Sequence, residues 1–352
     1  MANQHEYKGP ESYFLNWQYI VDKTEKLDKI IHDIIFKNPN ISFVWRGQKD
    51  STWGVQSSLY RKYKEIVGEY PSEEDLVKIE LEIIKEYREK WKADNVSALQ
   101  ILADLQHHGA PTRLLDVTLN PYIAAWFAVE EEKDEQGNIF EGDSRIFALA
   151  RNDLNAEKSV LEKINDIYSH VGDYDLFWHN HEFNAQKEEW GTGKGRRIWV
   201  PPTYNPRISA QNAAFLLDGI PTSHESVGSY FRFSYKSKND YLPIGEILDI
   251  GSMYMKLGKA ENKFSKIRGN KNNIASGYTI LIKSNVRKDI KNYLEKLYGY
   301  SENFMYPDIY GASNNIKNNI KNIIENIHHI YLGVFVARKI VLARLRTLSS
   351  MS

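Results

Sequence analysis

The chain has 352 residues, of which 42% are hydrophobic and 26% are charged, as in a soluble globular protein with room for one large domain or two ordinary ones. Lysine plus arginine and aspartate plus glutamate both number 46, which excludes a global electrostatic attraction to nucleic acid or anionic membranes. The lack of cysteine excludes disulfides, zinc ribbons and thiol nucleophiles, and we expect a cytoplasmic protein without a secretory signal or a membrane span.

The first predicted elements are one or two helices, because apolar residues recur at helical spacing between Phe14 and Ile35. The β-branched and aromatic run at 41–45 then predicts a core strand. It leads directly into Arg46-Gly47-Gln48, where a glycine lets the backbone approach a neighbour closely. We interpret this as a strand that ends at a pocket. The alternative is a strand followed by a turn, with Arg46 as a surface ion-pair partner.

Two further helices are expected before residue 110. Ser72, with Asp75 three residues later, predicts the start of a scaffold helix that reaches Trp91. Another helix begins near Ser97 and ends before Gly109, which is typical of a left-handed cap.

The passage from 105 to 129 is unusually rich in polar and backbone-restricting residues, so it is the first place to look for a site. Thr118 or Asn120, with Pro121, predicts the start of a helix whose free N–H groups could bind an anion. The structural alternative is that Arg113 and Asp116 form a buried ion pair and that the two histidines cap their own helix.

The rest of the chain alternates predicted strands with polar connections. Strand patterning is seen at 145–150, 197–202, 208–217 and 278–282, and a helix is expected at 286–297. Residues 151–195 are interpreted as a variable insertion, 256–271 as a basic loop and 314–324 as an amphipathic helix. The tail at 334–348 is either a helix for a partner or a membrane surface, or a solvated helix packed on the domain.

Three tempting motifs lack the spacing that their chemistry needs. The glycine-rich run 191–195 lacks the Walker spacing and the Ser/Thr that follows the lysine. His179, His181 and Glu182 are too close in sequence to converge on a metal, and no Glu-x-x-His follows, so no metal site is predicted. No Gly-x-Ser-x-Gly is present for a hydrolytic triad.

Four segments remain, and each couples an arginine with an amide or a backbone-special residue: 45–48, 58–61, 107–127 and 207–215. Arginine forks bind phosphate, and aromatic faces stack on heterocycles, so these segments have the parts for an anionic nucleotide. From the residues alone, this interpretation and the buried structural network stay equally open.

The sequence resembles the FRG domain family. The element that names the family, Phe/Tyr-Arg-Gly, is similar to Trp45-Arg46-Gly47-Gln48. The longest family signature matches Gln106 through Ala128, with His108 in place of tyrosine and Val117 in place of tryptophan. A later element is similar to Arg207, Gln211 and Phe215, with Ala213 in place of glycine, and residues 306–311 resemble the closing Phe-Pro-Asp-x-x-Gly.

The resemblance implies a layout like that of the ADP-ribosyltransferases: an α+β fold of mainly antiparallel sheets with flanking helices. It implies an N-terminal helical segment at 1–40, a domain at 41–312 and a basic helical tail at 313–352. In such a layout Arg46 and Gly47 hold the ribose and phosphates of NAD, and an aromatic residue flanks nicotinamide. Gln211 takes the position of a glutamate, which leaves the acid/base role open for Asp116, His107 or His108.

The resemblance therefore implies two sets of site residues. The catalytic candidates are Arg46, Gln211, His107 and His108. The candidates for binding NAD are Arg46, Gly47, Gln48, Tyr60, Arg61, Arg113, Asp116, Trp126, Phe127 and Arg207.

The expected function is that of an NAD-dependent ADP-ribosyltransferase, a bacterial toxin or phage-defence effector that modifies a nucleic acid or a protein. The alternative is a nucleotide- or nucleic-acid-binding module without turnover. A partner protein at the C-terminal helix is a further expectation.

Overall fold

The computed structural model describes residues 7–39, 41–91, 95–131, 139–150, 171–188, 190–193, 197–202, 205–222, 242–255, 257–258 and 276–308. The chain divides into two units, Met1–Tyr300 and Ser301–Ser352. Of the second unit the described part holds one short helix, α13 (Glu302–Met305), whose first turn is capped by Ser301 Oγ. The expected helices at 314–324 and 334–348 lie outside the described residues.

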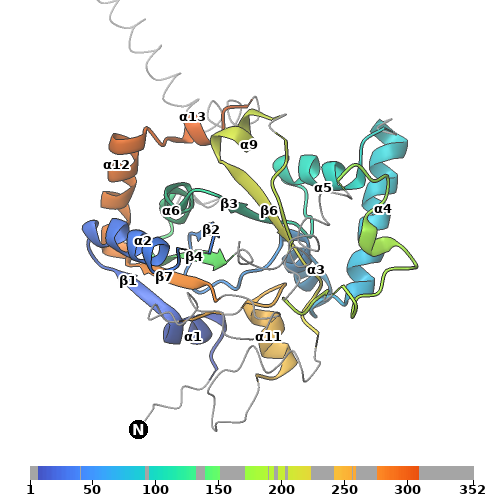
Figure 1. Ribbon diagram of the computed structural model, residues 1–352, viewed down its shortest axis with the longest axis horizontal. Coiled ribbons are helices and arrows are strands. Elements are labelled where there is room, and N and C mark those ends of the chain that lie inside the picture. Colours follow the sequence, from blue (N-terminus) through green and yellow to red (C-terminus); the bar gives the residue numbers. More distant parts are fainter. Residues whose placement is uncertain are drawn as a thin grey trace, which may run out of the picture. The chain divides into compact units, whose positions relative to one another are not determined.

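The first unit is built on one mixed sheet of seven strands with the order β1-β7-β4-β2-β3-β6-β5 (Figure 1). The strands are β1 (Gln18–Val21), β2 (Phe43–Gln48), β3 (Leu115–Thr118), β4 (Ser144–Ala150), β5 (Arg197–Trp199), β6 (Ala213–Leu217) and β7 (Tyr278–Ile282). β1 pairs with β7 in parallel, and every other neighbouring pair is antiparallel. The expected α+β class with a mainly antiparallel sheet is therefore confirmed.

Helices and 3₁₀ turns connect the strands. The helices are α1 (Pro10–Phe14), α2 (Glu25–Lys37), α3 (Ser58–Val67), α4 (Glu73–Trp91), α5 (Ala98–His107), α6 (Pro121–Val129), α9 (Pro206–Ala210), α11 (Ile244–Ile250) and α12 (Arg287–Tyr298). The 3₁₀ turns are η1 (Leu15–Trp17), η2 (Phe177–His179) and η4 (Ser284–Val286).

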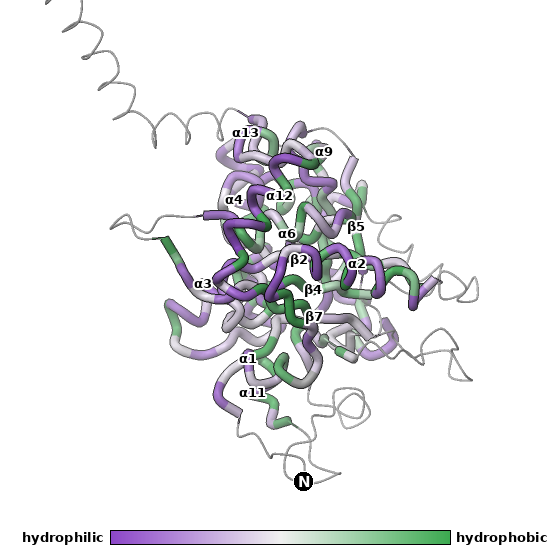
Figure 2. Tube along the Cα trace, turned by 90° about the vertical axis from the view of Figure 1, so that its left-hand side faces the viewer, coloured by the Kyte–Doolittle hydropathy of each residue, from purple (hydrophilic) through white to green (hydrophobic). Residues whose placement is uncertain are grey.

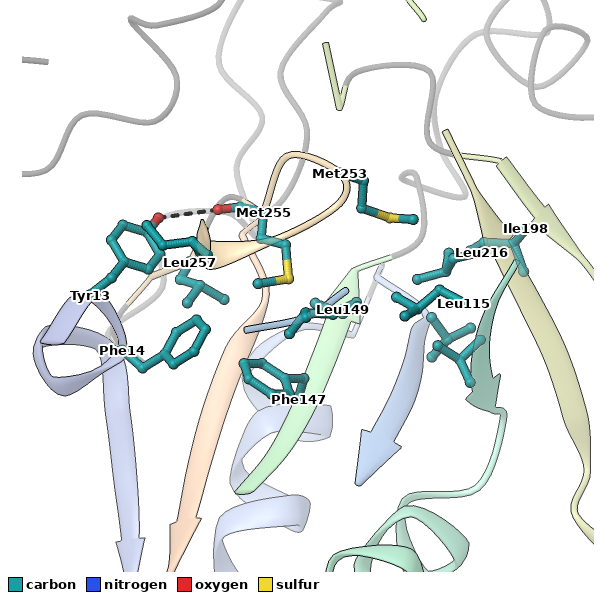
Figure 3. Close-up of a cluster of buried hydrophobic side chains, with 14 of the residues drawn as sticks. Tyr13, Phe14, Leu115, Phe147, Leu149, Ile198, Leu216, Met253, Met255 and Leu257 are labelled. Atoms are coloured by element: carbon teal, nitrogen blue, oxygen red, sulfur yellow. Dashed lines mark hydrogen bonds between the residues drawn. The ribbon is translucent and has the colours of Figure 1, made fainter. Parts of the chain in front are cut away.

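One face of the sheet carries a hydrophobic cluster to which α1, α11 and the segment 253–257 contribute side chains. Figure 3 shows Tyr13 and Phe14 of α1 and three residues of this segment beside Phe147 and Leu149 of β4. Val44 of β2 pairs with Leu149 of β4 and therefore points to the same face, where both are buried. The segment 253–257 is fixed there by the hydroxyl of Tyr13, which donates to the Met255 carbonyl at 3.1 Å. The apolar stretches of β4 and β7 run through the interior (Figure 2).

The opposite face carries a second cluster, in which Phe215 and Leu217 of β6 pack with Leu114 and with the apolar side of α5. Trp178 and Trp190 belong to this cluster and stack on each other with ring centroids 5.2 Å apart. The described part of the expected insertion at 151–195 is thus integral to the core, because it supplies both tryptophans.

Local capping signals position the helices as the sequence indicated. Ser72 and Asp75 exchange hydrogen bonds in a capping box before α4. Gly109 has φ +86° directly after α5 and Gly299 has φ +70° directly after α12, as left-handed caps require. For α6 the structure selects Asn120 as the N-cap, since its Oδ1 accepts from the Tyr122 N–H at 2.9 Å.

Three expectations about the elements were wrong. The segment 1–40 is not simply helical, because β1 lies between its helices and joins the sheet. The run 208–217 is not one strand, because Asn205 caps the short helix α9 and the strand begins only at Ala213. β2 does not end before the arginine, because it continues through Arg46 to Gln48.

Candidate functional site

The sheet is weakest at its centre, between β2 and β3. These strands share one residue pair, Trp45 with Thr118, whereas β2 shares six pairs with β4. Beyond that pair, the guanidinium of Arg46 bridges the two strands by donating from Nη1 to the Asp116 carbonyl at 2.7 Å. A side chain therefore takes the place of a ladder hydrogen bond, and the sheet has a break next to Arg46.

The break is lined from both faces of the sheet. Arg46 pairs with Phe147 and shares the face of the first hydrophobic cluster, whereas Asp116 pairs with Phe215 and shares the opposite face. The Asp116 side chain is exposed, although its neighbours Leu115 and Val117 are buried. Arg46 and Asp116 thus approach the same gap from different sides.

Arg61, on α3, adds a second guanidinium. Its Nη1 donates to the carbonyl of Gln56, and its side chain is otherwise exposed. Within the described ranges, neither Arg46 nor Arg61 forms an ion pair with a carboxylate, and both use main-chain carbonyls instead. The Nε of Arg46 is buried without a hydrogen-bond partner. Two positive charges therefore converge with donor capacity to spare, which suits an anionic ligand.

Electrostatics support this grouping of charges. Desolvation lowers the pKa of Arg46 to about 10, with Asp116 opposing this shift and Arg61 adding to it. Desolvation also lowers the pKa of Arg61, and Asp116 opposes it there as well. Asp116 thus interacts with both guanidiniums, and Arg46 and Arg61 repel each other.

His107, the last residue of α5, also interacts electrostatically with Asp116. Its ring is nearly buried, with its centroid 5.7 Å from that of Phe215. Burial lowers its pKa below 6.5, with Asp116 acting in the opposite direction. Its carbonyl accepts from Nη1 of the buried Arg207 at 2.9 Å, so Arg207 anchors the end of α5. His108, one residue later, is exposed.

The structure therefore brings together Arg46, Arg61, Asp116 and His107, with Arg207 behind them. The backbone of Gln211 lies next to Thr118, because its carbonyl accepts a hydrogen bond from Thr118 Oγ1 at 2.7 Å. Thr118 is the β3 residue that pairs with Trp45 of β2. This places the Gln211 backbone at the closed end of the break.

Gly47 lies directly against α6. A Cβ at this position would lie 2.7 Å from the Ala128 nitrogen and closer still to the Ala124 carbonyl oxygen. The space is filled by α6. The element Trp45-Arg46-Gly47-Gln48 and the helix α6 are thus two sides of one packing contact.

Three other candidates for the NAD site are buried parts of the scaffold. Gln48 is 4% exposed and donates to the Gly54 carbonyl at 3.0 Å, which ties down the loop after β2. Tyr60 is fully buried, stacks on Tyr70 and donates to the Leu248 carbonyl at 3.1 Å. Trp126 is 2% exposed within α6, edge-on to the half-buried Phe127. The structure does not bring these side chains to the break.

Arg113 is also removed from the site, and it does not pair with Asp116. It forms a fork with the fully buried Glu80 of α4, with Nε 2.6 Å from Oε1 and Nη2 3.0 Å from Oε2. Its Nη1 binds Glu73. Burial opposes ionisation of Glu80, but the charge of Arg113 and the hydrogen bonds to the carboxylate outweigh it, so the pKa of Glu80 is lowered.

Sequence reasoning missed the residues that complete this buried network. Trp178 Nε1 and His179 Nε2 both lie 2.9 Å from Glu80 Oε2, and Trp190 Nε1 donates to Glu73 at 3.0 Å. The only signal was the position of Glu80 on the apolar side of α4, where an acidic residue needs a buried partner. His179 is thus held by Glu80, while His181 is exposed.

The glycine-rich run at 191–195 binds an anionic group of the protein itself, the carboxylate of Asp218. The N–H groups of Gly191 and Gly193 donate to the buried carboxylate of Asp218 at 2.9 and 3.1 Å. Among the described residues, no group of three or more His, Cys, Asp or Glu side chains is placed to hold a metal.

These features define an α+β protein with an arginine-lined break at the centre of its sheet. Residues 41–137 match the model of the FRG domain, so this part of the chain is similar to that domain. The matched region runs from β2 through α6, and it therefore contains Arg46, Arg61, His107 and Asp116 but not Arg207 or Gln211. The comparisons with curated proteins and with solved structures found no match. In the described part of the chain no helix is long and apolar enough to cross a membrane.

Proposed function

We propose that the break between β2 and β3 binds NAD and that the protein transfers its ADP-ribose to a protein or nucleic-acid acceptor. The observation that carries this proposal is the interaction between Arg46 and Arg61, which both bind main-chain carbonyls and form no ion pair with a described carboxylate. Two guanidiniums with free donors suit the two phosphates of a dinucleotide. A nicotinamide nucleotide also fits the family resemblance to ADP-ribosyltransferases.

The residues that would hold NAD are fewer than the sequence implied. Arg46 and Arg61 would bind the pyrophosphate, and the exposed edge of His107 would donate a hydrogen bond to the ligand. Arg207 would act from behind, through the end of α5. Gly47, Gln48, Tyr60, Arg113 and Trp126 would stabilise the scaffold, and Phe127 would do so from its half-buried position on α6.

The proposed chemistry is the loss of nicotinamide through an oxocarbenium-like state, assisted by positioning and by local charge. An effector that acts on NAD in this way fits the roles of a bacterial toxin or a phage-defence protein. An alternative is a module that binds a nucleotide without turnover. It is favoured by one specific feature, namely that Gln211 offers an amide where many transferases carry a carboxylate.

Calorimetric titration of the full-length protein with NAD tests binding, and release of nicotinamide from labelled NAD, with and without cell lysate, tests turnover. Arg61→Gln should weaken NAD binding by about tenfold or more, the expected loss for a charge-assisted hydrogen bond of ~1.5–3 kcal/mol. Lys62→Gln is the matched control on the same helix, because Lys62 is exposed and its partner among the described residues is Glu65. Its affinity should stay within about twofold, as for a surface ion pair.

The outcomes separate the two functions. Binding of NAD with release of nicotinamide or labelling of a lysate component supports the transferase. Tight binding without any product supports the binding module. A protein that neither binds NAD nor forms product under any condition contradicts both.

A further inference from the structure

The break in the sheet holds one carboxylate, that of Asp116, and its surroundings differ from those of the protein's buried carboxylates. Glu80 and Asp218 are enclosed and saturated by donors from the protein itself. Asp116 is exposed, and no described side chain donates a hydrogen bond to it or forms an ion pair with it. Its oxygens are therefore open to a ligand.

We infer that Asp116 is the catalytic carboxylate of this site, in the role that an amide at Gln211 cannot fill. This inference rests on the proposed function, and it names the residue that accepts the proton from the acceptor. The proton acceptor must be a polar group at the break that can take up a proton while a ligand is bound there.

His107 is a poor proton acceptor for a structural reason. Its Nδ1 is buried without a hydrogen-bond partner among the described residues, and the imidazolium form would have to leave a charged N–H there unsatisfied. Burial therefore favours the neutral ring, with its proton on Nε2, the nitrogen that is not buried. In this state His107 donates a hydrogen bond to a ligand but does not take its proton.

The remaining candidates lack either the chemistry or the position. Gln211 carries an amide, which has no useful basicity. His108 is exposed, and among the described residues its side chain has no hydrogen-bond partner that would orient it. Asp116 is exposed on β3, its carbonyl binds Arg46, and its charge acts on Arg46, Arg61 and His107.

The position of Asp116 is also rigid, as a catalytic group requires. Its residue is held in β3 by pairing with Phe215, and its carbonyl is held by Arg46 at 2.7 Å. The same guanidinium that would bind phosphate thus fixes the backbone of the carboxylate. The hydrogen bond from Arg46 to the Asp116 carbonyl would therefore link phosphate binding to the position of the catalytic carboxylate.

The step balances without a further reactant. The acceptor oxygen forms a bond to C1′ of the ribose while the bond from C1′ to the nicotinamide nitrogen breaks. The electron pair of that bond stays on the nicotinamide ring, which leaves as neutral nicotinamide. The proton of the acceptor hydroxyl, or of water in the hydrolytic reaction, passes to the Asp116 carboxylate.

The experiment measures NAD affinity and nicotinamide release for the full-length wild type and for Asp116→Asn, Asp116→Glu and Asp104→Asn. For Asp116→Asn we expect turnover to fall by about 100-fold or more, as for loss of a general base, with an NAD dissociation constant within about threefold of wild type. Asp116→Glu should restore part of the rate. Asp104→Asn, which removes another carboxylate near His107, should keep the rate within about threefold.

Each alternative result is decisive. If Asp116→Asn releases nicotinamide at the wild-type rate, the inference is wrong and the proposed function stands. Loss of affinity in parallel with rate makes Asp116 a binding residue and overturns the catalytic role. If the wild type neither binds nor consumes NAD, the proposed function fails, and this inference fails with it. Thermal melting of each variant shows whether it is folded, and Asp116→Glu decides the question if the asparagine variant is not.

Discussion

Gly47 of β2 packs directly on the main chain of Ala128 in α6, so that a Cβ at position 47 would lie 2.7 Å from the Ala128 nitrogen. Backbone atoms cannot move aside as the end of a flexible side chain can. The glycine is therefore required by the contact between strand and helix, whether or not a ligand is bound.

Gly47→Ala should consequently destabilise the protein by about 3 kcal/mol or more, at the upper end of the cost of overpacking. Urea denaturation followed by tryptophan fluorescence measures this. Gly245→Ala is the control, because nothing lies within 4 Å of a Cβ at Gly245, which lies in α11. Alanine is a better helix former there, so its stability should be unchanged or slightly higher. Equal stabilities of the two variants would contradict the packing argument.

Arg113→Ala should cost about 3–5 kcal/mol of unfolding free energy, because it leaves the carboxylate of Glu80 buried without its main partner. Asp116→Asn, in contrast, should change stability by less than about 0.5 kcal/mol, as for an exposed position. The same denaturation experiment compares the two. A similar loss in both variants would instead favour a buried pair between Arg113 and Asp116.

The pH dependence of stability should contain a contribution from His107. Its pKa in the folded state lies below 6.5, so between that value and pH 6.5 the unfolded chain binds more protons than the folded one. This contribution to stability is present above pH 6.5 and is lost as the pH falls through that window. Unfolding free energies at pH 7.5 and 5.5 should differ less for His107→Gln than for the wild type. An NMR titration that gives a His107 pKa above 6.5 would contradict the sign.

Asn120 has two partners, and its variants should separate them. Its Oδ1 caps α6, and its Nδ2 donates to the Tyr300 hydroxyl at 3.0 Å. Asn120→Ala loses both and should cost about 1–2 kcal/mol. Asn120→Ser keeps a cap but loses the bond to Tyr300, so it should be intermediate. Thermal melts of the three proteins measure the order, and a serine variant as unstable as the alanine variant would contradict the capping role.

Elements whose determinants are local were predictable from the sequence. β4 and β7 are runs of apolar and β-branched residues, and α4, α5 and α12 carry their own caps. β1 was missed because Gln18–Val21 is short and its apolar residues fit the helical spacing on either side. α9 was missed because the apolar residues at 208–217 are typical of a strand, although Asn205-Pro206 predicts the start of a helix.

The candidate site was only partly predictable, because a side chain's role depends on partners that are distant in the sequence. Arg46, Arg61, Asp116 and His107 were all singled out, and the structure groups them. Arg113 was placed in the same set because it is near Asp116 in the chain, yet the two point to different surroundings. Its true partner is Glu80, on a helix that had been interpreted as scaffold. The residues next to an arginine in the sequence do not show whether it binds a ligand or is neutralised by a buried carboxylate.

The pairing of β1 with β7 has a consequence for the order of events during synthesis. Gln18 pairs with Thr279 and Val21 with Ile282, so β1, the first of the described strands in the chain, finds its strand partner only when β7, the last of them, has been synthesised. The antiparallel strands between them can assemble earlier, as can the helices that pack on them. Until β7 is synthesised, β1 and its exposed Ile20 remain open to contacts with other chains. Because β1 and β7 are far apart in the sequence, we expect their pairing to be a slow step in folding.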